Sequence, residues 1–208
     1  MGNLASLYRE QGRYDECEEL FRECVVLKSK KLGMDHPETL VAAMNLASIL
    51  QIQGNYPDAE MVYEETLKFR EIVLGYDHPS TLQSKDKVAN IYMLLGKYNQ
   101  SEAYYKYVLS TRTDLLGEYH PSTLGSVNNL ANLYMHLGQF DSAEPLYLKH
   151  VAAYDTGAIE LSPEVVIVYN NLGNRYHLDL ESLLSYLLSF SSFYSYSYDF
   201  YSLTTFPV

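Results

Sequence analysis

Three repeated histidines are the first residues in the sequence that could do chemistry. His36, His78 and His120 recur at a constant interval, and each is followed by proline. Imidazole is a common metal ligand, so the row suggests a metal site. A metal needs its donors at about 2.0–2.1 Å, whereas helices of successive repeats pack roughly 8–10 Å apart. We therefore interpret the histidines as loop residues ahead of a helix, and we predict neither a metal nor another cofactor.

A column of glutamates recurs at the same interval and could supply paired carboxylates for acid–base chemistry. Its members are Glu18, Glu60, Glu102 and Glu144. The same separation between repeats keeps them apart, so we expect them to bond within the stack or to face water. The sequence shows no glycine-rich phosphate loop and no Ser/His/Asp set. Since repeats fill the chain, we expect no enzyme.

Asparagines form the columns best suited to binding. Asparagine is a mediocre helix former, so its recurrence inside predicted helices needs a reason. An amide both donates and accepts, so a row of amides can bind the backbone of an extended peptide. The alternative is that these amides bond to neighbouring helices or face water. The candidate peptide-binding residues are Asn45, Ser48, Lys87, Asn90, Asn129, Asn132, Asn171 and Asn174. Flanking positions expected to tune specificity are Val41, Ile52, Gln83, Leu94, His136, Ile167 and Leu178.

These residues are positioned by a regular internal repeat, which self-similarity of the sequence reveals. Glycine recurs at Gly12, Gly54, Gly96 and Gly138. An aromatic residue follows each glycine two positions later, and a small residue follows three positions after that. The small column contains Cys17, Ala59, Ser101 and Ala143. Many columns in register indicate an array of similar units, in which Cys17 and Cys24 are packing residues.

Each unit predicts two helices. Pro37 suits a first helical position, where its missing N–H costs nothing. The apolar residues that follow at helical spacing are Leu40, Ala43, Leu46, Ala47 and Leu50. Gly54 can adopt the left-handed conformation that ends a helix. A second helix is expected to begin near residues 56–58 and to close at Leu74 and Gly75. The fold class is therefore all-α, a superhelix of stacked helical hairpins.

The domain organisation follows from the register. We predict a repeat array over residues 1–178, with full units at 32–73, 74–115 and 116–157 and partial units at 1–31 and 158–178. Residues 179–208 form a tail rich in Ser, Tyr and Leu that has lost the register. One hypothesis is that leucines in this tail form a short helix that caps the last repeat. The other is that the tail is disordered or not native to the repeat domain.

Composition excludes several partners. The chain of 208 residues has a formal net charge of -11, which disfavours nucleic acid. Its charge-free run from Ser182 to Tyr198 is shorter than the ~20 residues of a membrane span and is full of Ser and Tyr. The 2 cysteines suit a reducing compartment, so we expect a cytoplasmic protein.

Several segments resemble tetratricopeptide repeats of the 42-residue kinesin-light-chain type. They are LGMDHPETL (32–40), LGYDHPSTL (74–82), LGEYHPSTL (116–124), NNLANLY (128–134) and GQFDSAEPLY (138–147). The resemblance covers residues 1 to about 178. It implies a right-handed superhelix whose first helices line a concave groove, in which Asn45, Asn129 and Asn171 hold a peptide backbone. Kinesin light chains use basic grooves for acidic peptides that carry tryptophan. Here Lys87 is the one basic residue predicted in the central groove, so we do not expect that ligand class.

The leading functional hypothesis is a protein-interaction scaffold whose partner is a protein or an extended peptide. A second hypothesis is architectural self-assembly, because an uncovered end of a repeat stack can pack on another copy. A third is that the array is the sensor fragment of a larger multidomain NTPase protein.

Overall fold

The computed structural model describes residues 2–155, which form α-helices joined by short turns and contain no strand. The helices are α1 (Gly2–Glu10), α2 (Tyr14–Leu32), α3 (Pro37–Ile52), α4 (Tyr56–Leu74), α5 (Pro79–Leu94), α6 (Tyr98–Leu116), α7 (Pro121–His136) and α8 (Phe140–Asp155). The first helices of successive hairpins begin at Pro37, Pro79 and Pro121, which confirms the constant interval predicted from the sequence. The all-α fold class is also confirmed.

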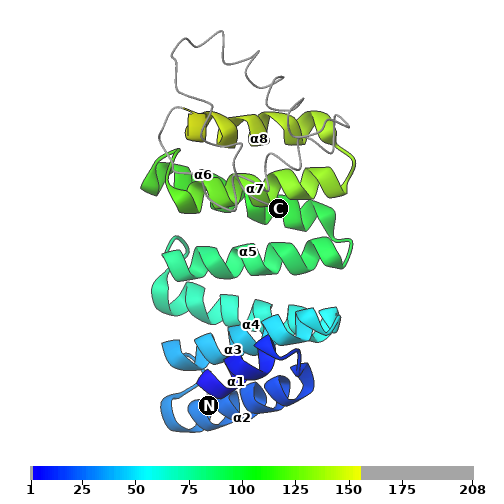
Figure 1. Ribbon diagram of the computed structural model, residues 1–208. Helices are drawn as coiled ribbons and strands as arrows, with labels where there is room; N and C mark the ends of the chain where they lie inside the picture. Colours follow the sequence, from blue (N-terminus) through cyan, green and yellow to red (C-terminus); the bar gives the residue numbers. More distant parts are fainter. Residues whose placement is uncertain (1, 156–208) are drawn as a thin grey trace. The chain divides into compact units, whose positions relative to one another are not determined.

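The described helices follow one another as antiparallel pairs. The chain divides into two compact units, residues 1–146 and residues 147–208, and the second contributes only the end of α8 to the described part. Within the first unit each helix from α1 to α6 contacts the next one, and α5 also contacts α7 (Figure 1). Each hairpin therefore buries its apolar face against its neighbours, as expected of a repeat stack.

Glycines with positive φ make the turns within each hairpin. Gly54 has a φ of 81°, so it ends α3 in the left-handed region as predicted. Its N–H donates to the carbonyl of Gln51 at 3.1 Å, and the N–H of Asn55 donates to the carbonyl of Leu50 at 2.9 Å. These two bonds satisfy carbonyls that the helix end would otherwise leave without partners. The pattern explains why glycine recurs at this point of every repeat.

The repeated histidines cap the first helices. The Nδ1 atom of His36 accepts a hydrogen bond from the N–H of Glu38 at 3.2 Å. His78 accepts from Ser80 at 3.2 Å, and His120 accepts from Ser122 at 3.1 Å. Each imidazole thus satisfies one of the free N–H groups at a helix start. The prediction placed the histidines correctly ahead of proline but missed this role.

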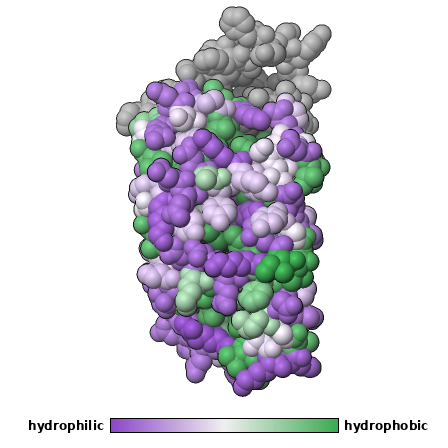
Figure 2. Space-filling view, turned by 180° about the vertical axis from the view of Figure 1, so that it is seen from behind, coloured by the Kyte–Doolittle hydropathy of each residue, from purple (hydrophilic) through white to green (hydrophobic). Residues whose placement is uncertain are grey.

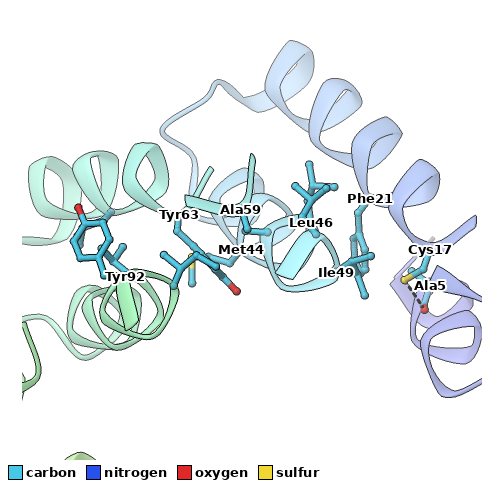
Figure 3. Packing of buried hydrophobic residues seen from close by; sticks show 14 residues of the cluster. Ala5, Cys17, Phe21, Met44, Leu46, Ile49, Ala59, Tyr63 and Tyr92 are labelled. Carbon is cyan, nitrogen blue, oxygen red and sulfur yellow. Dashed lines mark hydrogen bonds between the residues drawn. The ribbon is translucent and has the colours of Figure 1, made fainter. Parts of the chain in front are cut away.

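The core lies between consecutive helices and is built on two small columns. Cys17, Ala59, Ser101 and Ala143 are all buried in their helices, as predicted. Ala5, Ala47, Ala89 and Ala131 are equally buried in the partner helices. The Sγ atom of Cys17 lies 3.2 Å from the carbonyl oxygen of Ala5 (Figure 3), and the Oγ atom of Ser101 donates to the carbonyl of Ala89 at 2.7 Å. Small side chains here let the two helices of a hairpin approach closely.

Large apolar side chains fill the space between hairpins. Phe21 of α2 lies beside Leu46 and Ile49 of α3 (Figure 3). Of the stripe predicted in α3, Ala43 is only half-buried, and the other four residues are buried. Tyr63 is among the largest fully buried side chains of the described residues. The packing thus follows the predicted helical spacing, and aromatic residues occupy the gaps between layers.

Some predictions lie outside the described residues. These are the final first helix with Asn171 and Asn174, the flanking residues Ile167 and Leu178, and the tail 179–208 with its proposed capping helix. The limits of the partial and full units stay predictions.

Candidate functional site

The first predicted binding row lies on α3, α5 and α7. Asn45 and Lys87 are exposed, and Asn129 is half-buried. They hold the same position of their helices, so the stacking of the hairpins brings them onto one side of the first-helix layer. Asn129 donates through Nδ2 to Oδ1 of Asp86 at 3.4 Å, which leaves its carbonyl oxygen and its second N–H as further bonding groups. The row therefore offers amide and ammonium groups at its surface.

The second predicted row lies one turn further along and bonds within the stack. The hydroxyls of Ser48 and Tyr63 are 2.9 Å apart, and Tyr63 donates to Oε1 of Gln51 at 3.2 Å. A tyrosine hydroxyl carries one proton, so Ser48 is the donor to Tyr63. Gln51 then donates through Nε2 to Oδ1 of Asn90 at 2.8 Å. We call this run of four residues the Ser48–Asn90 relay.

The relay gives the polar residues of the second row a structural role. Asn90 also forms a hydrogen bond with the buried Tyr105. Burial raises the pKa of Tyr105 to about 12, although the bond to Asn90 acts in the opposite direction. Asn132, in the next repeat, is half-buried. The alternative that these side chains bond to neighbouring helices thus describes Ser48 and Asn90, and whether they also contact a ligand stays a proposal.

An ion pair beside the first row joins α5 to α6, the second helix of the same hairpin. Oδ2 of Asp86 lies 2.7 Å from Nη2 of Arg112, and the two side chains are only 14% and 12% exposed. Burial raises the pKa of Asp86, and both Arg112 and Asn129 oppose this rise. Arg112 also donates through Nη1 to the hydroxyl of Ser126 at 2.6 Å. The pair therefore fixes the carboxylate that orients Asn129, and the sequence analysis did not find it.

Apolar side chains flank the first row. Val41 and Ile52 of α3 are each 51% exposed, and Leu94 of α5 is 37% exposed. Gln83 and His136, also predicted to flank the row, are exposed. Exposed apolar groups therefore border the polar groups of the first row.

A buried lysine interrupts the core column that contains Ala43. Lys85 has a 4% exposed side chain, and its Nζ atom lies 3.2 Å from Oε1 of Glu71 and 3.2 Å from the carbonyl oxygen of Tyr76. Its Nζ atom also lies 4.3 Å from the centre of the Tyr107 ring. The sequence contains the signal that a lysine stands in a core column, but only the folded structure shows that Glu71 and Tyr76 are its partners. The ammonium group of Lys85 thus has its partners inside the fold, and Lys87 is the exposed basic residue of α5.

Two other kinds of site receive no support from residues 2–155. In that range no three His, Cys, Asp or Glu side chains are grouped so that they could hold a metal ion. None of the helices over the same residues combines the length and apolar character needed to cross a membrane. On the face drawn in Figure 2, hydrophobic residues form separate patches among hydrophilic ones.

Known proteins resemble this chain in its repeats and in its fold. The Tetratricopeptide repeat family model matches residues 1–72, 39–106 and 80–156. Two crystal structures of nearly identical TPR-like repeats, from a Podosopora anserina protein named as a kinesin light chain, are each 26% identical to this chain. One of them, a single-substitution variant, has a TM-score of 0.73 and covers 92% of this chain and 93% of that one. The other has a TM-score of 0.71 and covers 94% and 95%.

The crystal structure of BtubC (BKLC) from P. vanneervenii is 21% identical to this chain and has a TM-score of 0.74. The match covers 99% of this chain and 84% of that one, and at this identity it supports the fold alone. No curated protein matches the sequence.

Proposed function

Because the chain belongs to the tetratricopeptide repeat family, in its kinesin-light-chain-like form, we propose that it holds an extended peptide of a partner protein along α3, α5 and α7. Tetratricopeptide repeats generally mediate protein–protein interaction, and scaffolds of this kind are typically non-enzymatic. The observation that carries the proposal is the row of Asn45, Lys87 and Asn129, which keeps polar groups at the surface while the next row bonds inside the stack.

The chemistry of the row defines the ligand. Asn45 and Asn129 each offer a donor and an acceptor, which match the N–H and C=O groups of an extended backbone. Val41, Ile52 and Leu94 favour apolar side chains in the peptide. Lys87 is positioned for one carboxylate, because Asp86 beside it is already paired with Arg112. The ligand is thus an extended, mainly apolar peptide with at most one acidic group near its centre.

A peptide array followed by titration tests this proposal. Peptides that bind the wild type are titrated against the double variant Asn45→Ala/Asn129→Ala by fluorescence anisotropy. We expect affinity to fall roughly tenfold, since each lost hydrogen bond contributes about 0.5–1.5 kcal/mol. Asn99→Ala, which replaces an exposed asparagine on α6, is the matched control and should leave affinity unchanged. Unaltered binding of every peptide by the double variant would refute the amide row.

Self-assembly is the second candidate, and one contrast favours it. Leu4 and Leu7 of α1 are 43% and 47% exposed. The matching residues of the next repeat, Leu46 and Ile49, are 5% and 1% exposed because α2 packs against α3. The exposed face of α1 would be covered in the same way by a second helix from another copy. Head-to-tail growth seen by sedimentation should disappear in Leu4→Ser/Leu7→Ser, and a wild type free of such growth would exclude this route.

A further inference from the structure

The outer face of α4 carries two highly exposed apolar side chains that the hairpin itself does not use. The inner face of α4 contains Ala59, Tyr63, Thr66 and Arg70, all buried. Met61, Glu65, Lys68 and Ile72 each follow an inner residue by two positions, so they lie on the opposite side of the helix. Met61 is 63% exposed and Ile72 is 81% exposed, the most of any large apolar side chain among the described residues. These four residues are called the α4 seam below.

The repeat register shows that the α4 seam is not a requirement of the fold. Where α4 has Met61, α2 has Glu19 and α6 has Ala103. In place of Ile72, α2 has Lys30 and α6 has Asp114. The same helix position thus accepts charged or small side chains, which cost nothing in water. Large apolar groups at these positions of α4 alone indicate a contact beyond the hairpin.

The spacing of the α4 seam matches a helix–helix contact. Its residues are separated by four, three and four positions, which is the a/d spacing of two helices packed side by side, with apolar residues at the ends and charged residues at the centre. Together with Glu64 and Phe69, they line a shallow hollow along the helix. The seam therefore fits another helix over about three turns.

The order of residues makes the α4 seam complementary to itself. When two copies of α4 lie antiparallel about a twofold axis, residues at equal distances from the axis face each other. An axis midway between Glu65 and Lys68 places Met61 against Ile72 of the second copy at both ends. It also places Glu65 against Lys68 of the second copy twice at the centre. Two apolar contacts and two opposite-charge contacts result, with no like charges in register.

We propose that the α4 seam is a homodimer interface, with the second copy of this chain packed antiparallel along α4. Charge complementarity selects this occupant, because a helix of a foreign protein would need its own acid and base in the mirrored order. A contact along one helix is smaller than the ~1,200 Å² typical of stable interfaces. Association is therefore weak, and it stops at the dimer because a twofold contact is closed.

Charge reversal in sedimentation velocity tests the proposal. Glu65→Lys and Lys68→Glu each place like charges opposite each other twice, so each variant alone should dimerise about tenfold more weakly or not at all. An equimolar mixture of the two variants restores opposite charges at both central contacts and should form a heterodimer. Ile72→Ser should weaken every one of these dimers. The double variant Glu65→Lys/Lys68→Glu should dimerise like the wild type.

Matched controls come from the neighbouring repeats. Glu23→Lys makes the same charge change at the same position of α2, and Leu115→Ser removes an apolar side chain that is 60% exposed on α6. Both should dimerise like the wild type. A wild type that stays monomeric at the highest concentration, single variants that do not re-pair on mixing, or dimers abolished by Leu4→Ser/Leu7→Ser instead would each overturn the proposal. None of these results bears on peptide binding at Asn45 and Asn129, which is measured separately.

Discussion

Replacing Asp86 should destabilise the fold less than replacing Arg112. The preceding repeat provides a natural comparison. Arg70 occupies the position of Arg112 one repeat earlier, and Met44 occupies the position of Asp86. Arg70 is 5% exposed and donates to the Ser80 carbonyl at 2.8 Å and to the Ser84 hydroxyl at 2.9 Å. The fold thus accepts this arginine with two hydrogen bonds and no carboxylate.

Asp86→Met reproduces the surroundings of Arg70 around Arg112. The guanidinium keeps its bonds to the Ser126 hydroxyl at 2.6 Å and to the Ser122 carbonyl at 3.3 Å. We therefore expect a loss of about 1 kcal/mol or less, instead of the full cost of breaking a buried pair. Arg112→Met leaves the Asp86 carboxylate buried with Asn129 at 3.4 Å as its hydrogen-bond donor, and should cost about 3–5 kcal/mol at neutral pH.

The pH dependence of the two variants separates them further. Burial raises the pKa of Asp86, and loss of Arg112 removes a group that opposes this rise. The native state of Arg112→Met then binds the Asp86 proton at a higher pH than the unfolded chain does. Stability consequently rises as pH falls through that interval. The deficit of Arg112→Met should therefore shrink between pH 7 and pH 4, whereas that of Asp86→Met should not.

Urea denaturation followed by circular dichroism, at pH 7 and at pH 4, measures these differences. The double variant Asp86→Met/Arg112→Met should be close to Asp86→Met, because an apolar pair of similar volume needs no compensating charge. Equal losses for the two single variants at neutral pH would refute the comparison with Arg70. A deficit in Arg112→Met that is the same at both pH values would refute the buried carboxylate.

Three further outcomes test the turns and the core. His120→Ala should lower the free energy of unfolding by about 0.5–2 kcal/mol while His120→Asn restores it, as measured by urea denaturation, since asparagine also caps helices; equal losses would contradict the capping role. Gly54→Ala should lower the free energy of unfolding by about 1–2 kcal/mol in the same assay, because φ is 81°; no atom crowds the added Cβ, so the backbone conformation is the whole cause. Gly125→Ala inside α7 should raise the free energy of unfolding by about 0.5–1 kcal/mol. Tyr105 has a pKa of about 12 in the native state, whereas an unfolded tyrosine loses its proton near pH 10. The free energy of unfolding should therefore fall between about pH 10 and pH 12, by about 1.4 kcal/mol per pH unit at most. Thermal melts of Tyr105→Phe should show a shallower decline with pH, and an unchanged slope would exclude this cause.

The architecture was predictable because the residues that set it act locally. Pro37 at a first helical position, Gly54 at a helix end and the apolar spacing of α3 each follow from backbone and side-chain properties within one hairpin. Repetition at a constant interval then placed every other helix start. Helix starts, helix ends and apolar spacing depend on residues close in sequence, so they can be predicted without knowing which helices contact each other.

The candidate site was only partly predictable because its surface depends on contacts between hairpins. Asn45 and Asn90 look alike in the sequence, yet one is exposed and the other accepts a hydrogen bond from Gln51. The Asp86–Arg112 pair joins the two helices of one hairpin and is contacted by Asn129 and Ser126 of the next hairpin, and no local pattern distinguishes it from charges in water. Separating binding amides from structural amides requires the packed neighbours.

The Ser48–Asn90 relay has a mechanical consequence. It crosses from the hairpin of α3 and α4 to α5, so pulling these hairpins apart must break the bond between Gln51 and Asn90 at 2.8 Å. The hydroxyl of the buried Tyr63 keeps its bonds to Ser48 and Gln51 of its own hairpin, so the amide N–H of Gln51 is the group that loses its partner. Under tension the junction should therefore yield abruptly after little extension, which makes this part of the stack stiff against small loads.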